Sequence, residues 1–136
     1  MAQVSRSRAS LRIMGESLIP SEISKLLGRD GTTMYTKGDV FTSKTVDREV
    51  TRASGHWSLA TQACEPENLD GQVREILDQL TDDLDIWGEV STTYRCDIFC
   101  GLFLKESNEG MDISPSTLKL LGERGISLSL DIYDGS

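Results

Sequence analysis

A long alternation of apolar and polar residues at positions 92–105 is the feature that most constrains the fold. Every second side chain from Tyr94 to Leu104 is aliphatic, aromatic or a cysteine, and the positions between them carry a mixed set. A period of two is typical of a β-strand, because successive side chains point to opposite faces of a sheet. The segment therefore predicts a central strand. Its second face consists of Arg95, Asp97, Phe99, Gly101, Phe103 and Lys105.

Three shorter segments carry the same signal. Residues 8–14, 56–61 and 126–133 each alternate between apolar and polar positions and are bounded by turn-forming residues. Such segments predict strands that bury one face and expose the other. The side chains expected to face the core are Leu11 and Ile13, Trp57 and Leu59, and Ile126, Leu128, Leu130 and Ile132.

Two short helices have clear start and stop signals. The first covers residues 20–27, opens on a proline and is stopped by Gly28. The second begins at the N-cap Ser114, continues with Pro115 at the first helical position, and is stopped by Gly125. Proline near the start and glycine just past the end are the residues that favour these two boundaries.

The strongest helix signal runs over residues 69–87. Its apolar residues fall within an arc of about 100°, because successive helical residues turn by ~100°. We expect one helix of about five turns that ends at Gly88; alternatively, Thr81 caps a separate short helix. The polar side of the segment includes Asp78, Asp82 and Asp85.

These elements predict a single α+β domain over residues 1–136, with a mainly antiparallel sheet and three amphipathic helices packed on one face. A chain of 136 residues fits one domain and buries roughly two thirds of the surface of its unfolded chain. The weakly patterned stretch 29–55, rich in glycine, threonine and charge, predicts a long excursion that includes a twisted or flexible hairpin. Long segments of this kind are either functional or disordered.

The sequence favours the cytoplasm. No apolar run approaches the ~20 residues of a membrane helix, and the first residues do not lead into the apolar core of a signal peptide. The three cysteines form no disulfide framework. Cys96 and Cys100 share one strand face but lie about 13 Å apart along it, too far for a disulfide. We therefore expect reduced thiols and no membrane partner.

Charge is distributed unevenly along the chain, whose net charge is −8. Residues 1–52 carry nine Lys/Arg and six Asp/Glu, whereas residues 53–136 carry five Lys/Arg and sixteen Asp/Glu. An acidic protein without a basic stripe is poorly suited to neutralise phosphates, so we expect no nucleic-acid partner. The acidic half suits a basic protein partner.

Known catalytic arrangements are missing from the sequence. His56 is the only histidine and the chain has no GxSxG, so a serine or cysteine hydrolase is disfavoured. Neither GxGxxG nor GxxxxGK[ST] occurs. Asp82, Asp83 and Asp85 lack the loop glycine and terminal glutamate of an EF-hand, and the soft ligands are too scattered for zinc. We expect no catalytic residue, no metal and no cofactor, and we favour a protein that is not an enzyme.

Five segments together carry a family resemblance: "IPSEISKLLG", "YTKGD", "GHWSLAT", the long amphipathic stretch and "ISPSTLKLLGERGISLSLDIY". As a set they resemble the small bacterial family filed under domain of unknown function 4279, over nearly the whole chain. The resemblance implies a compact, stand-alone intracellular α+β domain. It implies no activity, and no site residue carries over from it.

Three functions from different classes follow. The first is a non-enzymatic protein-interaction module, of an immunity type, in which Asp78, Asp82 and Asp85 meet a basic partner. The second is a small-molecule binder or enzyme that uses a cleft beside the 29–55 excursion, near Lys37, His56 and Trp57. The third is a structural homodimer joined by a sheet edge, so that the chain is either a monomer or a homodimer.

Overall fold

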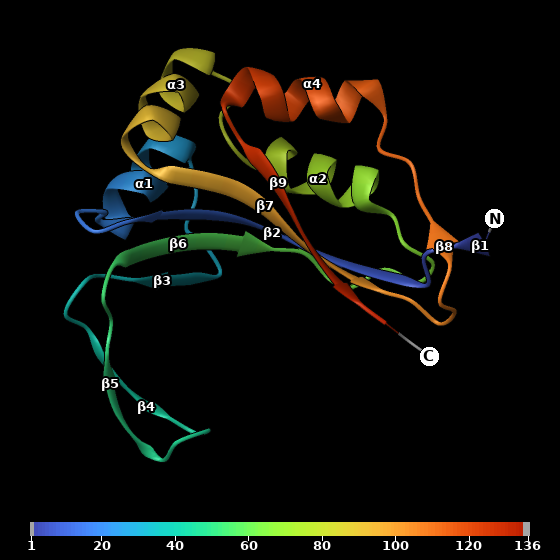
Figure 1. Cartoon of the computed structure of the whole chain (residues 1–136). Coiled ribbons are helices and arrows are strands. Elements are labelled where there is room, and N and C mark those ends of the chain that lie inside the picture. Colours follow the sequence, from blue (N-terminus) through green and yellow to red (C-terminus); the bar gives the residue numbers. More distant parts are fainter. Residues whose placement is uncertain (1, 135–136) are drawn as a thin grey trace.

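Five strands form the central sheet. They are β2 (Arg6–Gly15), β3 (Thr33–Tyr35), β6 (Gly55–Ala60), β7 (Arg95–Phe103) and β9 (Ser127–Tyr133). The computed structural model describes residues 2–134, and in it the strand order is β3-β6-β2-β7-β9 (Figure 1). All neighbouring strands are antiparallel except β7 and β9, which are parallel. The predicted α+β class with a mainly antiparallel sheet is therefore confirmed.

The predicted central strand is confirmed by β7, which lies between β2 and β9. Its pairing with β2 runs from Arg6 opposite Phe103 to Met14 opposite Arg95. A slip by one residue would turn the apolar face of β7 outward, so burial of Ile98 and its neighbours on that face fixes the register.

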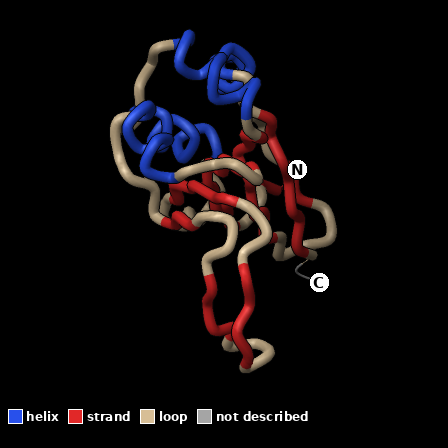
Figure 2. Tube along the Cα trace, turned by 90° about the vertical axis from the view of Figure 1, so that its left-hand side faces the viewer, coloured by secondary structure: helices blue, strands red, loops and turns tan. Residues whose placement is uncertain are grey.

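Four helices cover one face of the sheet (Figures 1 and 2). They are α1 (Pro20–Leu27), α2 (Leu69–Asp78), α3 (Leu84–Thr93) and α4 (Pro115–Arg124). The predicted start and stop residues of α1 and α4 are confirmed: Gly28 and Gly125 have φ angles of 99° and 72°. Ser114 caps α4, because its side chain accepts a hydrogen bond from the Thr117 amide.

The expectation of one long helix over residues 69–87 is wrong, and it accounts for four helices instead of three. The chain leaves the helical path after Asp78, and Asp83 caps α3 by accepting a hydrogen bond from the Asp85 amide at 3.0 Å. Thr81 is not the cap; its amide donates to the Leu27 carbonyl at 2.9 Å. The apolar stripe stays in phase because Leu80 and Trp87 contribute to the same core on either side of the break.

The core lies between the sheet and the helices. Leu11, Ile13 and Ile98 from the sheet and Trp87 from α3 are completely buried, each with 0% of its surface exposed. Complete burial of an aliphatic or aromatic side chain stabilises a fold by about 1.5–3 kcal/mol. The alternation along β2 and β7 therefore decides which face of the sheet the helices cover.

The excursion over residues 29–55 contains the predicted hairpin. Strands β4 (Val40–Ser43) and β5 (Arg48–Thr51) pair with each other and project away from the helix layer (Figure 2). Arg52 anchors the hairpin, because its guanidinium lies 3.8 Å from the Tyr35 ring centroid and 3.6 Å from that of Phe41. A further pair of short parallel strands, β1 (Ala2–Gln3) and β8 (Glu109–Gly110), joins the first described residues to the segment before α4.

Candidate functional site on the helix-free face of the sheet

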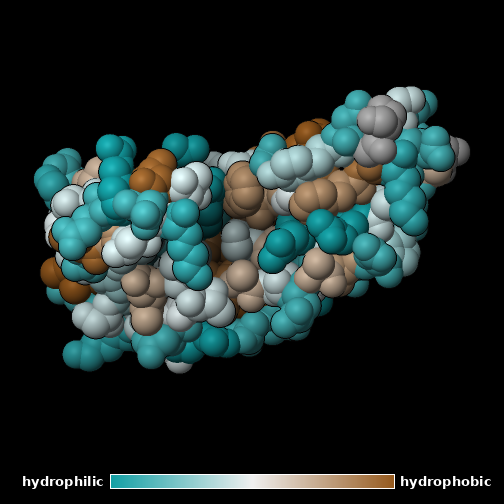
Figure 3. Space-filling view, turned by 90° about the horizontal axis from the view of Figure 1, so that it is seen from below, coloured by the Kyte–Doolittle hydropathy of each residue, from teal (hydrophilic) through white to brown (hydrophobic). Residues whose placement is uncertain are grey.

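Within the part of the chain that the structure describes, no second layer of helices or strands covers the sheet face opposite the helices. Figure 3 shows this face from below: hydrophilic side chains surround smaller apolar patches, and the surface is hollowed near its middle. The pairing of β2 with β7 places arginines beside aromatic rings on it. We call the residues that β2 and β7 point to this side, together with their partners on β3, β6 and β9, the helix-free face.

A buried ion pair lies at the centre of the helix-free face. Arg12 donates from Nε and Nη2 to the two carboxylate oxygens of Asp97, at 2.8 and 2.6 Å. The Ser129 hydroxyl donates to the same carboxylate at 3.0 Å. The Arg12 guanidinium also lies 4.3 Å from the centroid of the Phe99 ring. Four side chains from three adjacent strands are therefore held in one fixed arrangement.

The electrostatics of this pair follow from its geometry. Burial alone would raise the pKa of the Asp97 carboxyl, but the hydrogen bonds from Arg12 and Ser129 outweigh it and hold the pKa below its ordinary value. The hydrogen bond to Asp97 raises the pKa of Arg12. Both groups are charged at neutral pH, and each is satisfied by the other. The pair is suited to positioning Phe99 and unsuited to proton transfer.

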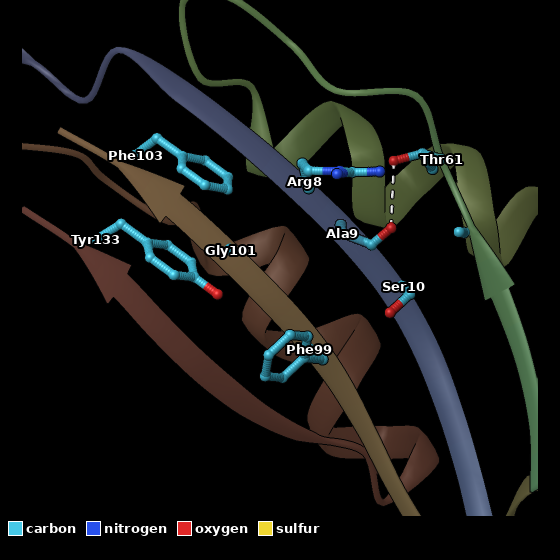
Figure 4. Close-up of a pocket in the computed structure, with 9 residues that line it drawn as sticks. Arg8, Ala9, Ser10, Thr61, Phe99, Gly101, Phe103 and Tyr133 are labelled. Atoms are coloured by element: carbon cyan, nitrogen blue, oxygen red, sulfur yellow. Dashed lines mark hydrogen bonds between the residues drawn. The ribbon is translucent and has the colours of Figure 1, made fainter. Parts of the chain in front are cut away.

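A hollow opens next to the pair, above Gly101 (Figure 4). Its volume is about 260 Å³. A Cβ atom at Gly101 would lie 3.3 Å from the Phe103 ring, so a larger residue there would narrow the space. In Figure 4 the rings of Phe103 and Tyr133 stand side by side at one end and Phe99 lies at the other. The lining residues are Arg8, Ala9, Ser10, Ala60, Thr61, Phe99, Gly101, Phe103 and Tyr133.

The rings of Phe103 and Tyr133 that line one end of the hollow belong to a stack of three side chains across three strands. The Phe103 and Tyr133 rings are nearly parallel, at 4°, with centroids 4.7 Å apart. The Arg6 guanidinium lies 4.1 Å from the Phe103 centroid, and its buried Nε has no hydrogen-bond partner among residues 2–134. The Tyr133 hydroxyl donates to Asp131 at 2.7 Å, which raises the pKa of the phenol. Stacking of this kind fixes the rings before any ligand arrives.

A second aromatic stack lies where the sheet meets the hairpin. The Tyr35 and His56 rings are stacked at 4.9 Å with an interplanar angle of 9°. Burial lowers the pKa of His56, and the positive charges of Arg12 and Arg52 lower it further. The imidazole is therefore neutral at pH 7, and its environment is electropositive.

The helix-free face is basic although the chain as a whole is acidic. Arg12 is the only one of its arginines that takes part in an ion pair between described residues. The other arginines on this face or stacked against its rings are Arg6, Arg8, Arg52 and Arg95. Four of the nine Lys/Arg residues within residues 1–52 thus lie on or against one surface: Arg6, Arg8, Arg12 and Arg52.

The structure does not bring the predicted cleft residues together. His56 and Trp57 are neighbours in β6, so they point to opposite faces of the sheet. Trp57 is 0% exposed, and its Nε1 donates to the Ser24 hydroxyl within the core. Lys37 is an exposed residue that forms an ion pair with Glu16. Of the three, only His56 lies on the helix-free face.

The predicted acidic residues lie on the opposite side of the molecule. Asp78 is the last residue of α2, Asp82 is in the following turn, and Asp85 is in the first turn of α3. Asp78 and Asp82 line a hollow of about 360 Å³ together with Arg74 and Arg124. The three carboxylates belong to a helix junction and not to one continuous helix face.

The residues at the centre of the helix-free face were not predicted as a site. The alternation over residues 92–105 placed Asp97, Phe99 and Phe103 on one strand face, and this was the available signal: two phenylalanines beside charges on the non-core side of a central strand. The alternation within residues 92–105 does not show which strand pairs with this one. Arg12 is 85 residues away in sequence from Asp97.

The fold and the site first define a class of protein. It is an α+β protein whose helices cover one face of the sheet and whose other face is open, basic and rich in aromatic side chains. The chain belongs to the family described as Domain of unknown function (DUF4279), whose model matches residues 4–135. Searches of curated proteins and of solved structures found no match.

No helix within residues 2–134 is long and apolar enough to cross a membrane. Within the same residues, no group of three or more His, Cys, Asp or Glu side chains is arranged to hold a metal ion.

Proposed function

We propose that this protein is a non-enzymatic interaction module that binds an acidic segment of a protein partner on the helix-free face. The proposal rests on the arginines and aromatic rings that lie together on a sheet face that the helices leave uncovered. A guanidinium without a carboxylate of its own is available to a carboxylate of the partner, and such charged hydrogen bonds contribute about 1.5–3 kcal/mol each. The proposed partner segment is acidic, whereas the negative net charge of the chain alone would favour a basic partner.

The size of the hollow favours a protein segment over a small molecule. Ligand pockets that enclose a whole small molecule usually measure about 300–1,000 Å³, and the hollow above Gly101 measures about 260 Å³. Its volume suits one apolar or aromatic side chain, with Arg8 placed to meet an adjacent carboxylate. A nucleic acid is disfavoured because Asp97 and Asp131 lie on the same face and oppose a continuous line of phosphates.

An array of short acidic peptides, each with one aromatic or aliphatic residue, tests the proposal. We expect binding to members of this array, weaker binding as salt rises, and no binding to the same array with lysine in place of glutamate. Equal binding to both arrays, or binding to neither, contradicts the proposal. A single-stranded oligonucleotide of matched charge separates general anion binding from recognition of a peptide.

Three variants locate the binding face. Arg8→Glu should weaken peptide binding at least tenfold, because it removes one charged contact and adds a repulsive one. Arg48→Glu makes the same charge change on the exposed β5 strand of the hairpin and should change affinity less than twofold. Gly101→Val should abolish binding by filling the hollow, without changing the net charge. Equal effects of Arg8→Glu and Arg48→Glu would show that net charge alone governs binding.

A basic partner at the α2–α3 junction is a second candidate, favoured by the shared hollow of Asp78 and Asp82. Replacing Asp78, Asp82 and Asp85 by lysine should break a complex of this kind. A complex that survives the replacement contradicts this candidate. If the protein has an immunity-type role, we propose that it acts through this second surface, by binding a basic partner.

We also propose that the protein works in the cytoplasm. All three cysteines are free thiols, and Cys96 and Cys100 are buried. Free thiols are typical of proteins in reducing compartments. Fractionation of cells that make the untagged protein tests the location, and recovery with the membrane or secreted fraction would contradict it.

A further inference from the structure

We propose that two copies of the chain pair through antiparallel β9 strands to form a two-fold symmetric homodimer. This inference is independent of the ligand proposed above. Strand β9 is the last in the order of the central sheet, and among the described residues no strand pairs with its outer edge. A free edge presents unpaired backbone donors and acceptors to any strand of matching pattern.

The edge has few of the features that protect such strands. Natural edge strands carry charged residues, above all lysine, or a proline or a bulge, whereas the seven residues of β9 include neither proline nor lysine and only one charge, Asp131. Its side chains are also more exposed than the alternation predicted. Leu130 and Ile132 have 49% and 59% of their surface exposed, so the expected burial of this strand face holds only toward its start.

The sequence of β9 is self-complementary in one register. A two-fold axis at Leu130 pairs all seven residues, from Ser127 opposite the second copy's Tyr133 to Tyr133 opposite its Ser127. Leu130 then faces itself, Leu128 faces Ile132, and Ser129 faces Asp131. An axis at Asp131 would instead place two carboxylates opposite each other, which is destabilising. The apolar positions therefore select the axis at Leu130.

Helix α4 offers a matching surface beside the strand. Leu118 is 51% exposed and lines an apolar hollow of about 510 Å³ together with Leu130 and Ile132. Leu120 and Arg124 line a different hollow with residues of α2, so Leu118 lies on the side of α4 away from α2. Gly122 follows Leu118 by one helical turn, and a Cβ atom there would meet no atom within 4 Å. Two α4 helices can thus approach each other over the paired strands.

Charge does not oppose this contact. Residues 115–133 carry two basic and two acidic side chains, so this segment is neutral in a chain of net charge −8. Asp78, Asp82 and Asp85 belong to the α2–α3 junction and lie outside this segment. Repulsion between charges farther apart than the Debye length of about 8 Å is screened at physiological salt. Contact through this neutral segment therefore brings no excess of like charge together at the interface.

Pairing would join the helix-free faces of the two copies. An antiparallel two-fold contact between edge strands keeps both helix layers on the same side, so the two five-stranded sheets become one continuous sheet. The two hollows next to Tyr133 would then open on one surface. A ligand with two acidic segments would gain affinity from binding both.

Light scattering on the full chain tests the dimer. We expect a mass twice that of the 15.0 kDa monomer at a protein concentration of about 100 μM, well above a Kd of ~1 μM, the weak end of the range for interfaces of standard size. Leu130→Lys should return the mass to that of the monomer by placing two ammonium groups at the axis. Val46→Lys, a matched change at a residue that is 51% exposed in the hairpin, should leave the dimer intact. A wild-type mass of one monomer contradicts the inference.

A cysteine at the axis provides a second readout that does not depend on tolerance of lysine. In a Cys64→Ser background, Leu130→Cys should form an intermolecular disulfide, because paired antiparallel residues have Cα atoms about 4.5–5.5 Å apart. Val46→Cys should not. Failure of Leu130→Cys to cross-link, or equal cross-linking of both variants, overturns the proposed register. Peptide binding by the Leu130→Lys monomer shows separately whether the helix-free face works without the dimer.

Discussion

Arg12 and Asp97 face each other across β2 and β7, and the guanidinium binds both carboxylate oxygens at 2.8 and 2.6 Å. Asp97 is only 1% exposed, although it points away from the apolar core. Its carboxylate is held between Arg12 of β2 and Ser129 of β9. The pair therefore contributes both to the stability of the sheet and to the shape of the proposed binding face.

Removal of one partner should destabilise the fold strongly. Asp97→Ala leaves the Arg12 guanidinium without its carboxylate, and we expect a loss of about 3 kcal/mol, the low end for breaking a buried ion pair, because Arg12 is partly exposed. Ser129→Ala removes one hydrogen bond and should cost about 1 kcal/mol. Urea unfolding measures both. The double variant Arg12→Met with Asp97→Leu should be close to wild type; a loss equal to the sum of the single changes would show that the two residues do not interact.

The same pair should make stability depend on acid pH. The pKa of Asp97 in the folded protein is lower than its ordinary value, so the folded state binds fewer protons than the unfolded state. The stabilisation is therefore complete above the unfolded pKa of about 3.9 and is lost as pH falls through the folded pKa. Unfolding curves between neutral pH and pH 2 should show a steeper loss for wild type than for Asp97→Asn. Parallel curves would contradict the assignment.

The helix break after Asp78 gives a prediction about capping. Asp83→Ala removes the acceptor for the Asp85 amide, and loss of an N-cap side chain costs about 1 kcal/mol. The neighbouring change Asp82→Ala alters charge equally and should stay within about 0.5 kcal/mol of wild type. Thermal or urea unfolding of the two variants makes the comparison. Equal destabilisation would indicate that charge, and not the cap, matters at this junction.

The cysteines should differ in reactivity. Burial raises the pKa of the Cys96 and Cys100 thiols to about 12, with a further contribution from the Asp97 charge. Thiolate is the reactive form, so these two should resist alkylation at pH 8 while Cys64, which is partly exposed, reacts. Mass spectrometry after iodoacetamide treatment should find one label on the folded protein and three in urea. Labelling of all three at equal rates without urea would contradict the burial.

The sequence could predict those parts of the fold that depend on local signals. The positions of β7, α1 and α4 followed from alternation, from proline and from glycine, and the structure confirms them. The prediction of one continuous helix was wrong at residues 79–83, because the spacing of apolar residues shows only which side chains face the core. It does not show whether the backbone between them stays helical. The caps at Asp83 and the contact of Thr81 with α1 decided that break.

The candidate site required the tertiary structure. The sequence by itself determined that one face of β7 would carry Asp97, Phe99 and Phe103, because a strand alternates its side chains. Only strand order and register decided that Arg12 would bind Asp97 and that Arg6 and Tyr133 would stack on either side of Phe103. These relationships join residues far apart in the chain, and pairing between strands is set by burial of whole sheet faces and not by any single segment.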